Sequence, residues 1–128
     1  MLEGDRCLFE IVFYENHKGE KPVEEYIKSL KNQPTSKDAR IKFNKISEYL
    51  RKLAEFGTPV GFPEVDKIEG EDDLWELRPL KDRIFFSYWT DNTFVMLHHF
   101  VKKSNKTPKR EIEQAVRNLK DWLERYGG

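Results

Sequence analysis

The order of apolar and polar positions along the chain predicts both strands and helices. Residues 8–14 form a short apolar and aromatic run, which predicts a strand that ends before a polar turn. Pro22 opens a predicted helix, and Ser36 is the expected N-cap of a second, longer helix that Gly57 ends. Each helix has apolar residues three and four positions apart, and therefore one apolar face. These residues are Val23, Tyr26, Ile27 and Leu30, and then Ala39, Phe43, Ile46, Leu50 and Leu53.

Strand patterns and short turns alternate through the second half of the chain. The acidic run 64–73 predicts a solvated edge strand followed by an exposed turn. Residues 74–78, 84–89 and 93–101 follow as three strands with short connections, which predicts an antiparallel meander.

A final helix is expected after the last strand, with Thr107 as N-cap and Pro108 at its first position. The predicted order is β-α-α-β-β-β-β-α. We therefore expect one α+β domain over residues 1–128. In it, an N-terminal helical hairpin and a C-terminal helix pack on an antiparallel sheet of four to five strands.

Length and composition exclude several classes of protein. A chain of 128 residues suits one domain with one core, and 13% aromatic residues argue against disorder. No apolar run approaches the roughly 20 residues that cross a bilayer, and the N-terminus has no signal-peptide pattern. Cys7 is the only cysteine, which excludes an internal disulfide and leaves it no companion cysteines for a zinc site. We therefore expect a reducing, cytoplasmic setting.

Positive charge is concentrated late in the chain. The 23 Lys and Arg residues balance 23 Asp and Glu residues, yet residues 78–110 hold eight cations against two aspartates, 8 − 2 = +6. The cations are Arg78, Lys81, Arg83, Lys102, Lys103, Lys106, Lys109 and Arg110. A basic sheet surface is what a small module needs if it holds a polyanion such as RNA.

Arg78 and Arg83 flank the first predicted turn of the meander, so both guanidinium groups could converge at one end of the sheet. Arginine matches phosphate oxygens through paired donors. The alternative is that Arg78 pairs with Glu76 or another acid, and Arg83 with Asp82 or the acidic run. Spacing alone does not decide between these two interpretations.

The last predicted strand carries two adjacent histidines and ends in two lysines. His98 and His99 are expected on opposite faces, His98 with Met96 and Phe100, and His99 with Leu97 and Val101. Either histidine is a buried, hydrogen-bonded residue, or it reaches the basic cluster and transfers protons. The lysines are either a solvated strand end or part of a phosphate-binding cluster beside Arg78. We find no metal-binding motif, no Gly-rich phosphate loop and no Ser-His-Asp order.

Two sequence blocks closely resemble the HigB-type, phage-derived branch of the RelE/ParE toxin superfamily. They are W-E-L-R-P at 75–79 and F-V-K-K-x-x-K-T-P at 100–108, in that order. The resemblance covers most of the chain and implies a RelE-like α+β toxin of a type II toxin–antitoxin pair. It also implies cleavage of messenger RNA on the ribosome (mRNA interferase activity), without a metal ion or cofactor. A helix-turn-helix, HigA-like antitoxin would neutralise the toxin and would alone contact operator DNA.

The resemblance also implies a mechanism and a set of site residues. The 2′-hydroxyl attacks the adjacent phosphorus and leaves a 2′,3′-cyclic phosphate and a 5′-hydroxyl. This reaction needs a base, positive charge on the phosphoryl oxygens and an acid for the leaving oxygen. The arginines would contact the phosphate, a lysine would hold the transition state or protonate the leaving oxygen, and a histidine would be the base. The catalytic candidates are Arg78, Arg83, Lys102, Lys103, His98 and His99; the RNA-binding candidates are Lys81, Lys106, Lys109 and Arg110.

The chain departs from this pattern in two respects. Residues 104–107 hold no tyrosine of the kind that some relatives stack on a base, and the net charge is zero. One scaffold serves several targets. The alternative function is therefore a non-catalytic or gyrase-directed binding protein on the same scaffold, and a third is a structural partner of a helix-turn-helix protein.

Overall fold

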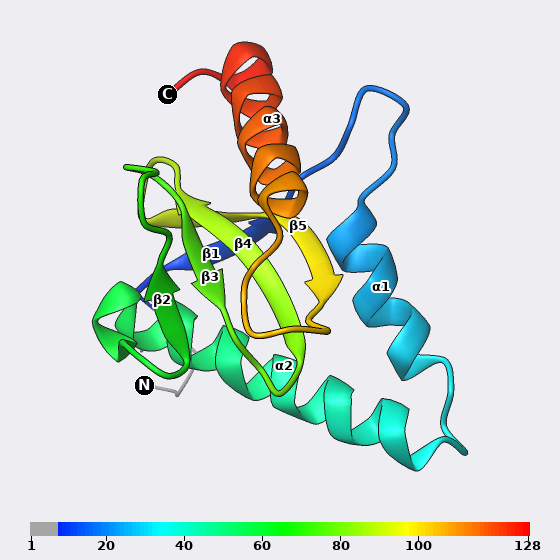
Figure 1. Cartoon of the computed structure of the whole chain (residues 1–128). Coiled ribbons are helices and arrows are strands. Elements are labelled where there is room, and N and C mark those ends of the chain that lie inside the picture. The colour runs from blue at the N-terminus through cyan, green and yellow to red at the C-terminus, as the bar shows by residue number, and fades with distance from the viewer. Residues whose placement is uncertain (1–7) are drawn as a thin grey trace.

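The computed structural model describes residues 8–128, so the predictions for Cys7 lie outside the described residues. Within this range the protein has five strands and three α-helices in an α+β arrangement (Figure 1). The elements are β1 (Glu10–Phe13), α1 (Pro22–Lys31), α2 (Lys37–Phe56), β2 (Val65–Lys67), β3 (Trp75–Leu77), β4 (Asp82–Tyr88), β5 (Thr93–Val101) and α3 (Lys109–Tyr126), with a 3₁₀ helix at Thr58–Val60.

The strands form one mixed sheet in the order β1-β5-β4-β3-β2. Neighbouring strands from β2 to β5 are antiparallel, which confirms the predicted meander and the acidic edge strand. β1, however, is parallel to β5, with Glu10 opposite Thr93, so the expected antiparallel sheet is wrong. The apolar run at 8–14 predicts a strand but carries no information about the direction of its partner.

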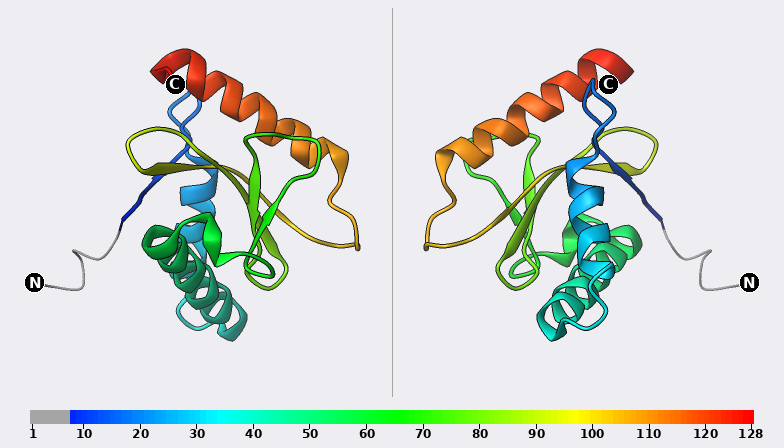
Figure 2. Two further views of the ribbon diagram at one scale, coloured as in Figure 1. Left: turned by 90° about the vertical axis from the view of Figure 1, so that its left-hand side faces the viewer. Right: turned by 90° about the vertical axis from the view of Figure 1, so that its right-hand side faces the viewer.

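Helices cover both faces of the sheet, as the two views of Figure 2 show, with α3 above the sheet and α2 below it. Ile84 and Phe86 of β4 pack in the core with α1 and α2, whereas Phe85 packs in the core with α3. All three side chains are fully buried. The expected basic surface on the sheet is therefore wrong: apolar residues occupy both faces, and cationic residues gather where strands end.

The predicted limits of the first two helices are confirmed. Pro22 begins α1. The Ser36 hydroxyl accepts a hydrogen bond from the Ala39 backbone N–H at 3.1 Å and caps α2. Gly57 ends α2 at φ 73°, a conformation that favours glycine. α1 and α2 contact each other across the short connection 32–36.

The predicted cap of α3 is off by one residue. Pro108 is the N-cap and α3 begins at Lys109. Thr107 is not the cap, because its hydroxyl donates to Oε2 of Glu76 at 3.2 Å.

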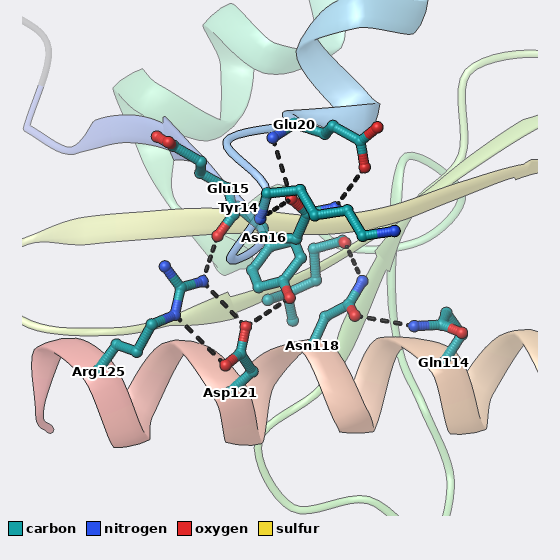
Figure 3. Close-up of polar contacts among 10 residues, drawn as sticks. Tyr14, Glu15, Asn16, Glu20, Gln114, Asn118, Asp121 and Arg125 are labelled. Carbon is teal, nitrogen blue, oxygen red and sulfur yellow. Dashed lines mark hydrogen bonds and ion pairs between the residues drawn. The ribbon is translucent and has the colours of Figure 1, made fainter.

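A polar network ties α3 to the rest of the molecule (Figure 3). The Tyr14 hydroxyl, just after β1, donates to Oδ2 of Asp121 at 2.6 Å, and Arg125 donates to the same carboxylate and to the backbone oxygen of Glu15. Asn118 donates to the Leu97 backbone oxygen at 2.8 Å. Burial and the bond to Asp121 raise the pKa of Tyr14 to about 12. These contacts hold α3 over β5.

Candidate functional site

Lysines from two distant segments meet at one end of the sheet. The Lys102 backbone N–H donates to the Lys81 backbone oxygen at 2.8 Å and joins the β3–β4 turn to the segment after β5. Lys81, Lys102 and Lys103 line one hollow of about 280 Å³. No ion pair engages these three ammonium groups within residues 8–128. We call these three lysines the cationic edge.

Arg78 lies at the start of the same turn but is held by a carboxylate. Its Nη1 donates to Oε1 of Glu76 at 3.0 Å, and its guanidinium lies 5.1 Å from the centre of the Phe62 ring. The Arg78 side chain is 19% exposed, while Glu76 is almost fully buried. Of the two interpretations of Arg78, the structure shows the pairing with Glu76.

Arg83 is buried, with 6% of its surface exposed. Its Nη1 donates to the backbone oxygens of Leu80 at 2.7 Å and Asp82 at 2.8 Å. Burial, with the nearby charge of Arg78, lowers the pKa of Arg83. The alternative interpretation required a bond from Arg83 to the Asp82 carboxylate. The structure shows instead that Arg83 donates to the backbone oxygen of Asp82. Arg83 therefore fixes the turn that carries Lys81.

A β-bulge in β5 decides which face each histidine occupies. Phe85 of β4 is opposite His98 and Phe86 is opposite Met96, so Leu97 is an extra residue in β5. The two histidines lie on opposite faces, as expected. The bulge shifts the alternation by one position, however, so the expected grouping of His98 with Met96 and of His99 with Leu97 is wrong.

His98 faces α3. Its Nε2 lies 2.6 Å from Oε1 of Glu111, and its ring stacks on Phe85 with centroids 6.2 Å apart. This histidine therefore joins β5 to the start of α3, away from the face that carries α1 and α2.

His99 faces α1 and α2 and belongs to a buried polar network. Its Nε2 lies 2.9 Å from Oδ1 of Asp82, and its ring stacks on Tyr26 at 3.7 Å between centroids. The Tyr26 hydroxyl donates to the same Oδ1 at 2.7 Å, and Nζ of Lys42 lies 3.9 Å from it. The His99 side chain is 13% exposed and that of Asp82 is fully buried.

These contacts control the charge of Asp82. Burial alone would raise the pKa of this carboxyl, but hydrogen bonds from His99 and Tyr26, together with the Lys42 charge, bring it below its ordinary value. Burial and the bond to Asp82 raise the pKa of Tyr26. Oδ2 of Asp82 has no hydrogen-bond partner within the described residues. Asp82 is therefore ionised at neutral pH and orients the His99 ring.

Sequence reasoning identified His99 but not its partners. Tyr26 fits the apolar stripe of its helix, Lys42 fits a solvated helix face, and Asp82 fits a turn. The four residues come from four separate segments, so no spacing in the sequence brings them together.

Two residues of the network, Tyr26 and Lys42, also line a hollow beside the turn. A pocket of about 650 Å³ lies between α1, α2 and the turn, and its lining includes Tyr26, Lys42, Leu80 and Lys81. Lys81 lines this pocket and is also one of the three lysines of the cationic edge, so the pocket and the edge adjoin each other.

The remaining cationic candidates lie around the start of α3. Lys106 is exposed. Nζ of Lys109 lies 3.9 Å from Oε2 of Glu113, and Nε of Arg110 lies 3.6 Å from Oε2 of Glu111. Both cations are largely exposed, so these pairs contribute little to stability. Arg110 also lines a hollow of about 540 Å³ together with Lys103. Within residues 8–128 no group of three or more His, Asp or Glu side chains could hold a metal ion.

The fold and the site define an α+β protein with helices on both faces of a mixed sheet, and with a cationic edge beside a partly exposed histidine paired with a buried aspartate. Residues 25–120 match the family described as "Phage derived protein Gp49-like (DUF891)", and the chain belongs to this family. The match spans every candidate site residue and confirms the phage-derived part of the predicted resemblance. The HigB type and the predicted activity stay predictions.

A comparison with curated proteins gives no match. None of the helices within residues 8–128 combines the length and the apolar character that a membrane span requires.

Proposed function

We propose that this protein is the HigB-type toxin of a type II toxin–antitoxin pair, and that it cleaves messenger RNA on the ribosome without a metal ion. The observation that carries the proposal is the meeting of Lys81, Lys102 and Lys103 beside the His99–Asp82 pair. Membership of the Gp49-like family and the two sequence blocks at 75–79 and 100–108 support it.

The cationic edge supplies the contact with the RNA backbone. The chain has no net charge, yet these three ammonium groups gather around one hollow and make the local potential positive. Phosphates attract such a cluster and release their counterions on binding, which favours association at low salt.

His99 is the proposed general base. A carboxylate only accepts hydrogen bonds, so Nε2 of His99 donates to Asp82 and the neutral ring keeps its lone pair on Nδ1. Nδ1 takes the proton of the 2′-hydroxyl, the 2′-oxygen bonds to phosphorus, and the bond from phosphorus to the 5′-oxygen breaks. The products are a 2′,3′-cyclic phosphate and a 5′-hydroxyl.

Lys102 and Lys103 complete this chemistry. One ammonium group stabilises the negative charge that develops on the phosphoryl oxygens, and the other protonates the leaving 5′-oxygen. Arg78 and Arg83, which were the first candidates for phosphate contacts, instead support the turn through Glu76 and the backbone.

A helix-turn-helix, HigA-like antitoxin is the proposed partner, and it would supply the contact with operator DNA. A reading frame of that type immediately beside this one would support the pairing.

A second candidate function is a binding protein without cleavage activity, for example one directed at gyrase. Both arginines and both histidines already have partners inside the protein. This internal pairing favours a surface that binds rather than reacts.

Mapping of RNA ends after induction in cells separates the two candidates. Induction of the wild-type chain should arrest growth and create new 5′-hydroxyl ends within translated messages. The combined Lys81→Ala, Lys102→Ala and Lys103→Ala variant should lose both effects. A matched variant that removes three exposed lysines elsewhere, Lys18, Lys28 and Lys120, should keep them. Growth arrest without new ends would favour the second candidate.

A further inference from the structure

The pocket of about 650 Å³ beside the cationic edge combines apolar and polar walls. Leu30, Ala39, Ile41 and Leu80 supply apolar surface, and the volume falls within the range of small-ligand sites. Ile41 and Leu80 are both large apolar residues that stay exposed. The pocket therefore offers an apolar slot that the protein itself does not fill.

Leu80 is held at the lip of this pocket in a conformation that leucine rarely adopts. Its φ is 57°, and it is 48% exposed. The buried guanidinium of Arg83 fixes the position by donating to the Leu80 backbone oxygen at 2.7 Å. A left-handed, exposed leucine costs stability and persists only where its surroundings impose it, and such positions gather at ligand contacts.

The next residue in the turn connects the pocket to the cationic edge. Lys81 lines the pocket next to Leu80 and also lines the hollow with Lys102 and Lys103. One turn therefore presents an apolar side chain and an ammonium group side by side. A nucleotide has the same pairing, because it joins an apolar, flat base to an anionic phosphate.

Polar groups around the pocket suit the edge of a base. Ser29, Gln33 and Asp38 line it, and together they offer both hydrogen-bond donors and acceptors. A base that is paired in a duplex could not enter such a slot, whereas an unpaired base presents both its faces and its edge.

We propose that this pocket binds one unpaired nucleobase of the RNA whose phosphates lie on the cationic edge, with Leu80 as the apolar contact. The inference rests on the proposed RNA-directed function of the edge and extends it to the recognition of a single-stranded base.

The test measures binding of the full chain to two fluorescent oligomers by anisotropy. One is a single-stranded RNA of eight nucleotides, and the other is an abasic ribose-phosphate oligomer of the same length. Leu80→Asn removes the apolar side chain but keeps a residue that tolerates positive φ, so the turn should keep its shape. Leu8→Asn is the matched control, because Leu8 is an equally apolar and exposed residue. It lies next to β1, which pairs with the start of β5, whereas the turn that carries Leu80 lies at the end of β5.

Leu80→Asn should weaken binding of the RNA roughly five- to tenfold and leave binding of the abasic oligomer unchanged, since stacking and apolar contacts act on the base alone. Leu8→Asn should change neither affinity. The double variant Lys102→Ala and Lys103→Ala should weaken binding of both oligomers to the same extent. The proposal is overturned if Leu80→Asn leaves RNA binding unchanged or weakens both oligomers equally. Loss of antitoxin binding alone in Leu80→Asn would also overturn it, and would assign the pocket to a protein partner.

A second measurement separates the pocket from the edge. If neither oligomer binds the wild-type chain, the proposed function fails, and free adenosine, guanosine, cytidine and uridine then test the pocket by chemical-shift changes in NMR spectra. Shifts around Leu80 and Gln33 that disappear in Leu80→Asn would uphold the base pocket on its own. The absence of shifts with all four nucleosides would overturn it.

Discussion

His99 donates a hydrogen bond through Nε2 to Oδ1 of Asp82 at 2.9 Å, and the Asp82 side chain is inaccessible to solvent. The bulge at Leu97 creates this relationship, because it turns His99 toward α1 and α2 and His98 toward α3. One strand therefore presents two adjacent histidines with different carboxylate partners on different faces. This difference makes the two residues a matched pair for mutagenesis.

His99→Gln should lower RNA cleavage by about 10²–10⁴-fold, the usual contribution of a general base. His98→Gln should leave cleavage nearly unchanged, because its ring faces Glu111 on the other side of the sheet. Rates of 5′-hydroxyl end formation in a translation extract measure both variants. Equal losses in the two variants would remove His99 from the mechanism.

Asp82→Asn should destabilise the fold by about 3 kcal/mol at pH 7, since it removes a buried charge from His99, Tyr26 and Lys42. The folded protein holds the pKa of Asp82 below its ordinary value, so the ionised carboxyl stabilises the fold above about pH 4. That contribution is lost as the pH falls. Urea unfolding should therefore show a smaller gap between wild type and variant at pH 3 than at pH 7. The exposed Asp73→Asn variant is the control, and a gap independent of pH would contradict the assignment.

Arg78→Ala should cost about 2–3 kcal/mol of stability, because it leaves the buried Glu76 carboxylate with Thr107 as its remaining side-chain partner. In the double variant with Glu76→Gln the losses should not add, and the coupling should be about 1–3 kcal/mol. Lys109→Ala, which breaks an exposed pair with Glu113, should cost less than about 0.5 kcal/mol. Additive losses for Arg78 and Glu76 would show that the pair does not stabilise the fold.

Tyr14→Phe should lower stability by about 1 kcal/mol near neutral pH, since the hydroxyl donates to Asp121 at 2.6 Å. The pKa of Tyr14 is raised to about 12, so the protonated hydroxyl stabilises the fold fully below about pH 10. This contribution is lost as the pH rises from there to about 12. Unfolding followed between pH 8 and pH 11 should show the gap closing, and the exposed Tyr126→Phe variant should show no gap. A gap that stays constant with pH would contradict the role of the hydroxyl.

Local features of the fold could be predicted from the sequence because local interactions determine them. The Ser36 cap, the Gly57 stop and the strand at 93–101 depend on neighbouring residues, and the structure confirms them. The parallel pairing of β1 with β5 depends on contacts between residues about 83 positions apart, and nothing in residues 8–14 encodes it.

The candidate site could be predicted only in part, because some of its features depend on local sequence and others on contacts between distant segments. The end of β5 was recognised from its lysines, but the pairing of Arg78 with Glu76 and the burial of Arg83 depend on the three-dimensional surroundings of each guanidinium. The run Leu97-His98-His99 suits a regular strand and gives no sign of the bulge. Asp82 therefore became a site residue only once the structure placed it beside His99.

The salt dependence of RNA binding tests the central claim most directly, because it measures contacts between the cationic edge and phosphates. The logarithm of affinity falls linearly with the logarithm of salt concentration. For single-stranded RNA, each phosphate contact contributes about 0.7 to the magnitude of this slope. The Lys81, Lys102 and Lys103 triple alanine variant should therefore have a slope shallower by about 2 than wild type. The matched triple variant of Lys18, Lys28 and Lys120 should keep the wild-type slope. Equal slopes in all three proteins would contradict the assignment of the cationic edge as the RNA site.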